Sequence, residues 1–362
     1  MLPIPVTRML GLACLLLAAF TPCANAMDEV TVAADGTMHL PAVDVPLSPM
    51  MSPAARQRFV DEAVHPYEFD MSGDIARERE SVDGWYRPRV ERARALFPVK
   101  IRPLLIGGVR TDEITPEAGI GPRNHSRVLI NLHGGGMLWG GHLGGLAESI
   151  PISALGRIRV IAVDYRLAPE FRHPAAQEDL AAVYRELLKR YRPGQIGIYG
   201  CSAGAGLTAG SIAWFKQHGL PRPGAIGLFC WGGGDSGGDS FGLQGLLDVS
   251  WEIGIFEKMK THPLIDPAES YFSTADSTDP VVAPAGSPAT LAQFPPTLLL
   301  SGTRDAGMSN VVFTHAQLVK AGVEADLHVW EGMGHNFLLE MDLPECREAY
   351  DVIVRFFTHH LR

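Results

Sequence analysis

The pentapeptide 200–204 reads Gly-Cys-Ser-Ala-Gly and places a serine, Ser202, between two glycines. A short apolar run, 195–199, precedes it, and the small and apolar residues of 205–217 that follow are typical of a buried helix. A Gly-x-Ser-x-Gly elbow turns a strand sharply into a helix and exposes the serine hydroxyl at its tip. A side chain at either glycine would collide with the neighbouring strand or helix. The pattern predicts Ser202 as a nucleophile, provided that the chain also supplies a base, an acid and an oxyanion site.

An acid and a base of suitable kinds lie nearer the carboxyl end. Asp305 follows the apolar run 297–300, and His335 follows the run 325–330. The chain order serine, acid, histidine is one of the known orders of a catalytic triad. We expect His335 to take the Ser202 proton and to return it to the leaving alcohol. We expect Asp305 to fix the imidazole tautomer and to stabilise its charged form.

Each of these two residues also has an ordinary structural use. Asp305 would serve equally as a helix N-cap or turn aspartate, and His335 as a hydrogen-bonded loop histidine. Glu331 and Asp326 are alternative acids near His335. Asp326 lies inside a strand pattern, which makes it the weaker of the two.

Residues 133–136 read His-Gly-Gly-Gly and directly follow the apolar run 128–132. Consecutive glycines let backbone N–H groups point into a cleft without a Cβ in the way, which is what an oxyanion site requires. An ordinary glycine turn is the alternative, but the elbow downstream favours the oxyanion role. We expect His133 to brace this loop by hydrogen bonding and not to act as the base.

Two further stretches, 234–238 and 238–242, also match Gly-x-Ser-x-Gly. The first contains Ser236 and resembles the nucleophile loop of trypsin-like proteases. The candidate acid and histidine follow Ser236 as well, so chain order leaves it open. The residues after Ser236 are rich in glycine, however, whereas Ser202 has the strand-turn-helix context, and a trypsin-like chain would carry its histidine and aspartate upstream. We therefore assign the nucleophile to Ser202 and expect the glycine run to belong to a lid.

The elements that must position these residues form an alternating pattern from residue 98 onward. The predicted strands are 99–106, a run from 109, 128–132, 159–163, 195–199, 225–229, 297–300 and 325–330, and the predicted helices are 175–191, 203–217, 311–321 and about 344–360. Such alternation predicts an α/β fold with a mainly parallel sheet covered by helices on both faces. In these sheets the chemistry lies at the carboxyl ends of strands, where every motif above falls.

The amino-terminal part divides into three stretches. Residues 1–26 contain a positive residue, an apolar run too short to span a bilayer and a small-x-small site, so we expect a signal peptide cleaved after Ala26 and a secreted or periplasmic protein without stable membrane insertion. Residues 27–97 predict an extended lead-in followed by cap helices. Within them, the charged runs 77–80 and 87–94 are typical of the solvated faces of two helices, with an arginine-rich substrate site as the alternative.

Charge and cysteine content exclude several classes of function. The formal net charge of −9 becomes −10 without the signal segment, whose one charged residue is Arg8. An acidic surface argues against nucleic acid or anionic membrane as a partner. Three cysteines then remain, Cys201, Cys230 and Cys346, which is too few for a disulfide framework, although the last two would be able to pair. The sequence contains no metal cluster, phosphate loop or dinucleotide fingerprint, so we expect neither metal nor cofactor.

Several ordered motifs together resemble one family of enzymes. They are HGGG at 133–136, DYRLAPE at 164–170, GCSAG at 200–204, DPVVAP at 279–284, PPT at 295–297 ahead of Asp305, and GMGHNF at 332–337. From about residue 128 to the end, the chain resembles the hormone-sensitive-lipase family of carboxylesterases. The resemblance implies an α/β-hydrolase fold in a catalytic domain at 98–362, with a cap formed by amino-terminal helices and an insertion at about 231–282. It also implies hydrolysis of carboxylic esters, usually short-chain ones.

The same resemblance assigns roles residue by residue. It implies a triad of Ser202, Asp305 and His335 and oxyanion donors on Gly135, Gly136 and Ala203, with Gly134 adjacent to them. The chain departs from the family pattern at Cys201, where aspartate or threonine is usual, at Ala205 in place of a second glycine, at 306–310, and at Asn336 in place of a glycine. None of these departures removes a catalytic atom, but they leave the acyl pocket and the substrate class open.

Two other functions remain open on the sequence alone. One is an exported deacetylase acting on acetylated polysaccharide or on aromatic esters, which keeps the same chemistry. The other is a non-catalytic protein that binds a small molecule on a hydrolase scaffold, against which the complete triad argues. For the carboxylesterase we expect a small-molecule ester as the partner, and the oligomeric state, including a dimer, stays open.

Overall fold

The computed structural model describes residues 30–39, 44–234, 238–240, 262 and 270–362. The predicted signal segment lies outside the described residues, and so does most of the predicted cap insertion at 231–282. The chain divides into two compact units, Met1–Pro46 and Leu47–Arg362. In the first, strands β1 (Thr31–Val32) and β2 (Met38–His39) pair antiparallel, so the predicted extended lead-in includes a short hairpin.

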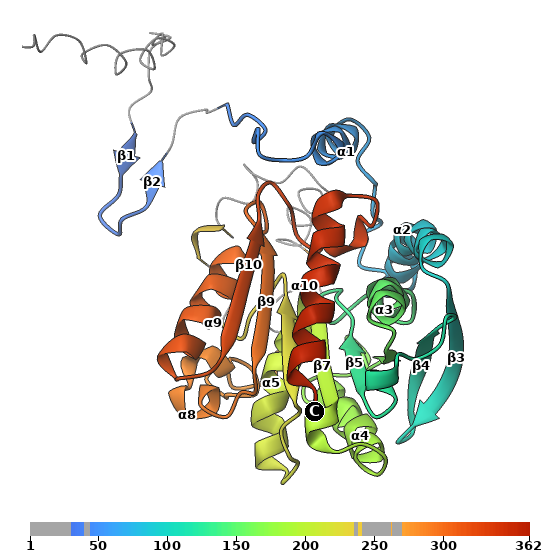
Figure 1. The fold of residues 1–362 in the computed structure, drawn as a ribbon. Coiled ribbons are helices and arrows are strands. Elements are labelled where there is room, and N and C mark those ends of the chain that lie inside the picture. The colour runs from blue at the N-terminus through green and yellow to red at the C-terminus, as the bar shows by residue number, and fades with distance from the viewer. Residues whose placement is uncertain (1–29, 40–43, 235–237, 241–261, 263–269) are drawn as a thin grey trace, which may run out of the picture. The chain divides into compact units, whose positions relative to one another are not determined.

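An eight-stranded sheet forms the centre of the second unit, in the order β10-β9-β8-β7-β5-β6-β4-β3 (Figure 1). The strands are β3 (Val99–Ile106), β4 (Val109–Pro116), β5 (Val128–Leu132), β6 (Arg159–Val163), β7 (Ile196–Cys201), β8 (Ala225–Phe229), β9 (Thr297–Gly302) and β10 (Ala325–Trp330). Strand β4 alone runs in the opposite direction to the other seven, since it pairs antiparallel with both β3 and β6. The predicted mainly parallel sheet is confirmed.

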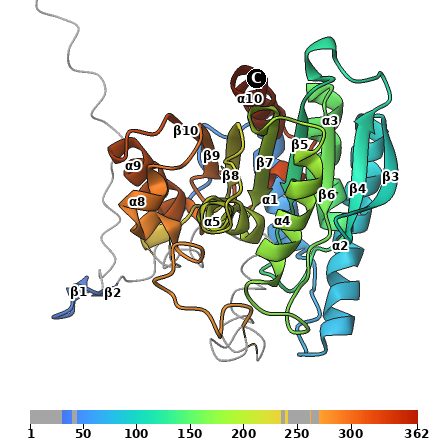
Figure 2. The ribbon, with the colours of Figure 1, turned by 90° about the horizontal axis from the view of Figure 1, so that it is seen from below.

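Helices cover both faces of this sheet, as Figure 2 shows from below. The described helices of this unit are α1 (Pro53–Val64), α2 (Ile75–Leu96), α3 (Leu143–Gly156), α4 (Ala175–Leu188), α5 (Ala203–Gln217), α8 (Pro288–Leu291), α9 (Met308–Lys320) and α10 (Pro344–His360). Helices α3 and α10 lie on one face, and α4, α5 and α9 lie on the other. Among the described residues, no helix is both long enough and apolar enough to cross a bilayer.

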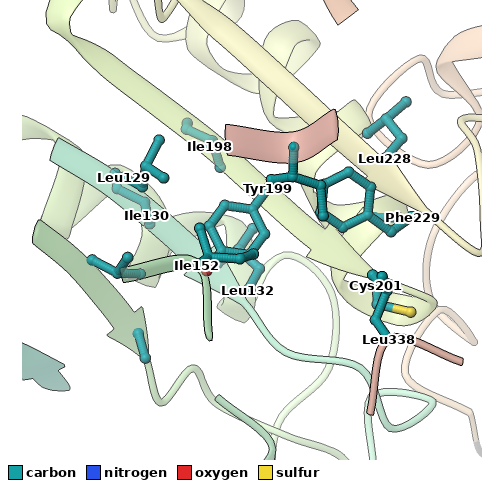
Figure 3. Packing of buried hydrophobic residues seen from close by; sticks show 14 of the residues in the cluster. Leu129, Ile130, Leu132, Ile152, Ile198, Tyr199, Cys201, Leu228, Phe229 and Leu338 are labelled. Carbon is teal, nitrogen blue, oxygen red and sulfur yellow. The ribbon is translucent and has the colours of Figure 1, made fainter. Parts of the chain in front are cut away.

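The core lies on the two faces of the central strands. Every residue of β5, β7, β8 and β9 is buried, because helices cover the sheet on both sides. Figure 3 shows Leu132 of β5, Tyr199 of β7 and Phe229 of β8 within this core, where the rings of Tyr199 and Phe229 lie 5.8 Å apart. This packing gives the carboxyl ends of the strands a rigid base.

Helix α3 is absent from the helices predicted by the sequence. Gly144, Gly145 and Pro151 interrupt its sequence, and such residues usually mark turns and loops. Its residues 144–153 are all buried, so the helix carries no alternation of apolar and polar faces that would reveal it. It packs against α2, α10 and the sheet, and tertiary contacts therefore stabilise it in place of local propensity.

The prediction of two solvated helix faces at 77–80 and 87–94 is wrong in two respects. Both charged runs belong to the single helix α2. Glu78, within the first run, is fully buried with an exposed fraction of 0%.

Helix α1 begins after Ser52, whose side chain accepts a hydrogen bond from the Ala55 amide. The Ser52 amide donates to Glu345 Oε1 at 2.8 Å, and this hydrogen bond connects the start of α1 to α10.

Two glycines of α5 should respond very differently to replacement by alanine. A Cβ on Gly204 would lie 1.8 Å from the Leu132 carbonyl oxygen, whereas a Cβ on Gly206 would meet nothing closer than a Trp231 carbon at 3.8 Å. We expect Gly204→Ala to lower the free energy of unfolding by about 3 kcal/mol through overpacking. We expect Gly206→Ala to raise it by about 0.5 to 1 kcal/mol through helix propensity. Urea denaturation of both variants measures the difference, and equal shifts would contradict the close approach.

Candidate active site

The nucleophile elbow joins β7 to α5 at Ser202. This residue has a φ of +56° and a ψ of −121°, a conformation that is strained for any residue other than glycine. A Cβ on Gly200 would lie 2.3 Å from the Leu132 carbonyl oxygen, and one on Gly204 even closer. The flanking glycines therefore allow the elbow to press against the end of β5, and the tight turn presents the half-buried Ser202 side chain at the carboxyl edge of the sheet.

His335 and Asp305 form a buried hydrogen-bonded pair at the same edge. The distance between His335 Nδ1 and Asp305 Oδ1 is 2.8 Å. Asp305 also accepts hydrogen bonds from the Gly307 amide at 2.7 Å and from Ser301 Oγ at 2.7 Å. With its proton on Nδ1, the imidazole has its lone pair on Nε2, the nitrogen that can accept a proton. Asp305 is thus a carboxylate that hydrogen-bonds His335, whereas the alternative acid Asp326 is exposed on β10.

The turn after β8 connects the elbow to this pair. The Ser202 amide donates to the Phe229 carbonyl oxygen at 2.8 Å. The next residue, Cys230, places its sulfur within 4.8 Å of a carboxylate oxygen of Asp305 and a ring nitrogen of His335. Ser202, Asp305 and His335 therefore follow the ends of three separate strands, β7, β9 and β10, and the turn at 229–230 contacts both the elbow and the Asp305–His335 pair.

The glycine loop after β5 supplies backbone amides beside the elbow. Gly135 and Gly136 have φ values of +115° and +60°, and a Cβ on Gly135 would lie 2.2 Å from the Trp139 carbonyl oxygen. Within the described part of the chain, the amides of Gly135, Gly136 and Ala203 donate no hydrogen bond. The three predicted oxyanion donors are therefore available to a ligand.

His133 forms hydrogen bonds within the glycine loop, as expected from the sequence for a residue that braces it. Its Nδ1–H donates to the Gly134 carbonyl oxygen at 2.6 Å, and its ring stacks on Tyr165 with centroids 4.2 Å apart. Tyr165 Oη in turn donates to the His133 carbonyl oxygen at 2.7 Å. Burial lowers the pKa of His133 below its ordinary value, so this imidazole stays neutral and serves the loop.

The serines of the two other Gly-x-Ser-x-Gly matches are Ser236 and Ser240, and the two cysteines that were candidates for a disulfide are Cys230 and Cys346. Ser236 lies outside the described residues, whereas Ser240 is buried and donates its hydroxyl to the Ala306 carbonyl oxygen at 2.7 Å. Cys230 and Cys346 are free thiols with different partners: the Asn336 amide donates to Cys230 Sγ, and Cys346 Sγ donates to the Leu338 carbonyl oxygen. They form no disulfide with each other.

Two groups of side chains have the donor atoms that a metal ion could use. Cys230, Asp305 and His335 form the first, but its carboxylate and imidazole already hydrogen-bond each other. The second group is at the surface and consists of Glu324, His359 and His360. Exposed groups of this kind are common without a bound ion.

A recess lies beside His335, and residues between 51 and 62 line it together with Trp85 and the loop that carries His335. Met51 and Phe59 contribute from the region of α1, Trp85 from α2, and Met333 and Phe337 from the loop that carries His335. The charged side chains of Arg58, Glu62 and Glu340 also line it. The cap role of the amino-terminal helices stays a prediction.

Comparison with known proteins extends these observations. Residues 129–339, more than half of the chain, match the family model described as alpha/beta hydrolase fold. An acetyl-hydrolase of Streptomyces hygroscopicus is 28% identical over 237 residues, which cover 65% of this chain and 76% of that protein. The crystal structure of esterase E25 superposes with a TM-score of 0.75 at 27% identity, over 90% of this chain and 99% of that one. The crystal structure of an esterase from the bacterial hormone-sensitive lipase family gives a TM-score of 0.70 at 25% identity, over 86% and 99% of the two chains.

The chain belongs to the hormone-sensitive-lipase-like family of α/β hydrolases. It has the α/β-hydrolase fold and is a carboxylic-ester hydrolase. The backbone conformation explains one departure from the family pattern. Asn336, which replaces a usual glycine, has a φ of +53°, and asparagine tolerates this left-handed region better than most residues.

Glu148 is a residue of the hydrolase site that the sequence did not reveal. It lies on α3 with an exposed fraction of 7%. Its Oε1 accepts a hydrogen bond from the Gly134 amide at 2.9 Å, and its Oε2 accepts one from Asn131 Nδ2 at 2.9 Å. The Gly134 amide is therefore occupied, which separates it from the three available amides. A single carboxylate inside an otherwise apolar stretch, 143–156, was the available signal.

The environment of Glu148 makes its charge unusually costly. Burial raises the pKa of Glu148 to about 7, although the hydrogen bonds from Asn131 and from the backbone of Gly134 and Cys201 partly oppose this effect. The site of the hydrolase thus contains a carboxyl group that changes its charge near neutral pH.

Glu78 is a second buried carboxylate, and it joins three segments. Its oxygens accept hydrogen bonds from the Gly73 amide at 2.7 Å and from Trp139 Nε1 at 3.1 Å, and His262 Nε2 lies 2.7 Å from Oε1. Trp139 belongs to the loop between β5 and α3, residues 133–142, which is called the oxyanion loop because it contains the predicted donors Gly135 and Gly136. The Trp139 ring would contact a Cβ on Gly136 at 3.5 Å. Helix α2 is therefore linked directly to the loop that presents the oxyanion amides.

Replacement of Glu148 by glutamine should change how stability depends on pH. The folded protein holds the Glu148 proton up to about pH 7, whereas an unfolded glutamate releases it near its ordinary pKa of 4.5. Stability of the wild type should therefore fall as pH rises from about 4.5 to 7, by up to about 3 kcal/mol relative to Glu148→Gln. Urea unfolding of both proteins between pH 4.5 and 8 measures this, and curves that remain parallel would contradict the shifted pKa.

Proposed function

We propose that this protein is a serine carboxylesterase in which Ser202 is the nucleophile, His335 the general base and Asp305 the orienting acid. The observation that carries the proposal is the 2.8 Å contact between His335 Nδ1 and Asp305 Oδ1 at the edge of the sheet where the elbow presents Ser202. The order of these residues in the chain supports the same roles.

The proposed reaction proceeds in two halves. His335 Nε2 takes the Ser202 hydroxyl proton while the serine oxygen attacks the ester carbonyl carbon. The tetrahedral intermediate collapses when the carbon–oxygen bond to the alcohol breaks and His335 returns the proton to that oxygen. A water molecule, deprotonated by His335, then attacks the acyl-enzyme, and the second intermediate releases the carboxylic acid and regenerates Ser202.

Backbone amides stabilise the negative oxygen of both intermediates in this proposal. Gly135, Gly136 and Ala203 supply the donors, since these amides have no other acceptor among the described residues. Removing one such donor costs about 3 to 4 kcal/mol of transition-state stabilisation. Their fixed orientation matters because the amides need not reorganise as charge develops.

We propose short-chain esters as substrates. The match to a protein named acetyl-hydrolase supports a small acyl group. The recess beside His335 supports an apolar moiety of limited size, since Met51, Phe59 and Trp85 form its walls while Arg58 and Glu62 place charges there. Burying a long acyl chain against such charges would be unfavourable.

Hydrolysis of nitrophenyl acetate and butyrate tests the nucleophile. We expect Ser202→Ala to lower kcat at least about 10⁴-fold, because no other hydroxyl among the described residues has the elbow geometry. Ser236→Ala serves as the matched control and should keep wild-type kcat. Loss of activity in Ser236→Ala with retention in Ser202→Ala would reverse the assignment. In the same assay, acetate and butyrate should react faster than laurate, and a preference for laurate would overturn the proposed substrate class.

The role of the acid is tested by replacing it with its amide. Asp305→Asn should lower kcat on the order of 10⁴-fold, because asparagine favours the wrong imidazole tautomer and no longer stabilises the imidazolium ion. Asp326→Asn, at an exposed position on β10, should leave kcat unchanged. Circular dichroism of both variants shows whether they fold. An Asp305→Asn protein that is folded and fully active would refute the triad.

A further inference from the structure

We propose that Glu148 is a positioning residue that fixes the oxyanion loop against the nucleophile elbow, an inference that rests on the proposed serine mechanism. Glu148 lies on α3, below the loop that begins at His133. No motif in the sequence assigns it a role. Its contacts place it between the loop and the elbow.

Gly134 lies where the oxyanion loop, the nucleophile elbow and Glu148 meet. A Cβ built on Gly134 would lie 3.1 Å from the Cys201 carbonyl oxygen, 3.4 Å from Ser202 Cβ and 3.6 Å from Glu148 Oε1. The last two distances limit the separation between the carboxyl group and Ser202 Cβ to about 7 Å. Glu148 thus lies directly behind Gly134, the second residue of the oxyanion loop, and within about 7 Å of Ser202 Cβ in the elbow.

Hydrogen bonds fix Gly134 on both sides of its backbone. Its amide donates to Glu148 Oε1 at 2.9 Å, and its carbonyl oxygen accepts from His133 Nδ1 at 2.6 Å. Glycine has the widest backbone freedom of all residues, so these bonds decide which way the loop leaves β5. The orientation of the Gly135 and Gly136 amides follows from that direction. Without the carboxyl group, the Gly134 amide would be a buried donor without an acceptor, which favours rearrangement of the loop.

The proposed role requires an acceptor oxygen and does not require a charge. Asn131 donates to Glu148 Oε2 through Nδ2, and Asn131 Oδ1 has no hydrogen-bond partner in the described part of the chain. With glutamine at 148, the side-chain oxygen would still accept from Gly134. Asn131 would turn its amide so that Oδ1 accepts from the new NH₂ group. Glutamine should therefore replace glutamate, whereas alanine should not.

Steady-state kinetics of nitrophenyl butyrate hydrolysis tests the role of Glu148, with active sites counted by the nitrophenol burst. Glu148→Ala should lower kcat per titrated site about 10²-fold with KM changed less than about threefold, because oxyanion stabilisation acts in the transition state. Glu148→Gln should stay within about fivefold of wild type. Ser153→Ala, which removes another buried hydrogen bond of α3 away from the loop, should keep wild-type kcat per site.

A trifluoromethyl ketone adds a readout that a purely structural role would not change. This inhibitor forms a tetrahedral adduct with the serine, so its affinity should fall in Glu148→Ala by about the same factor as kcat. If Glu148→Ala does not fold, Glu148→Asp gives the same test. Its carboxylate is one methylene shorter and is withdrawn from Gly134, and we expect a loss of at least about tenfold in kcat.

The outcomes separate this inference from the proposed function. Wild-type kcat per site in Glu148→Ala, unchanged ketone affinity, or a glutamine variant as impaired as alanine would overturn the positioning role while Ser202→Ala remains inactive. A wild type without esterase activity, or an active Ser202→Ala protein, would overturn the serine mechanism and this inference with it.

Discussion

The close approach of two backbones, the elbow after β7 and the end of β5, is the constraint on which the site depends. Gly204 leaves no room for a Cβ beside the Leu132 carbonyl oxygen. This contact forces the chain through a positive φ at Ser202 and starts α5 at once. It also places the elbow next to the glycine loop, which leaves β5 immediately after Leu132. Strain at the nucleophile is thus maintained by the packing of a fully buried parallel sheet, whose strands cannot shift without opening the core.

Two buried carboxylates then attach the oxyanion loop to the helices around it. Glu148 on α3 accepts from Gly134 at the start of the loop, and Glu78 on α2 accepts from Trp139 near its end. Arg79, next to Glu78, donates to the Leu138 carbonyl oxygen at 3.0 Å as well. A glycine-rich loop has little rigidity of its own. These side chains replace that missing rigidity, because each buried donor or acceptor that loses its partner costs about 1 to 3 kcal/mol.

The sequence was sufficient for the sheet and for the order of the motifs, because both are local signals. Apolar runs such as 128–132 identify strands that are buried on both faces, and the elbow is readable as a strand-turn-helix pattern. Contacts between distant segments were not readable. The charge of Glu78 indicated a solvated surface, yet His262 and Trp139 enclose it from other parts of the chain. Helix α3 was missed for the related reason that burial on all sides removes the periodicity from which a helix is recognised.

A carboxyl group so near a developing oxyanion poses an electrostatic conflict. Glu148 Oε1 lies at most about 7 Å from Ser202 Cβ, and two negative charges 7 Å apart repel each other by about 2 kcal/mol at an effective dielectric constant of 20. The buried amide of Gly134 nevertheless needs an acceptor. Burial reconciles the two demands, since it raises the pKa of Glu148 to about 7 and lets a proton neutralise the group near physiological pH. One oxygen of the protonated carboxyl group still accepts from Gly134. The low polarity that makes the charge unfavourable therefore also makes the hydrogen bond a rigid support for the loop.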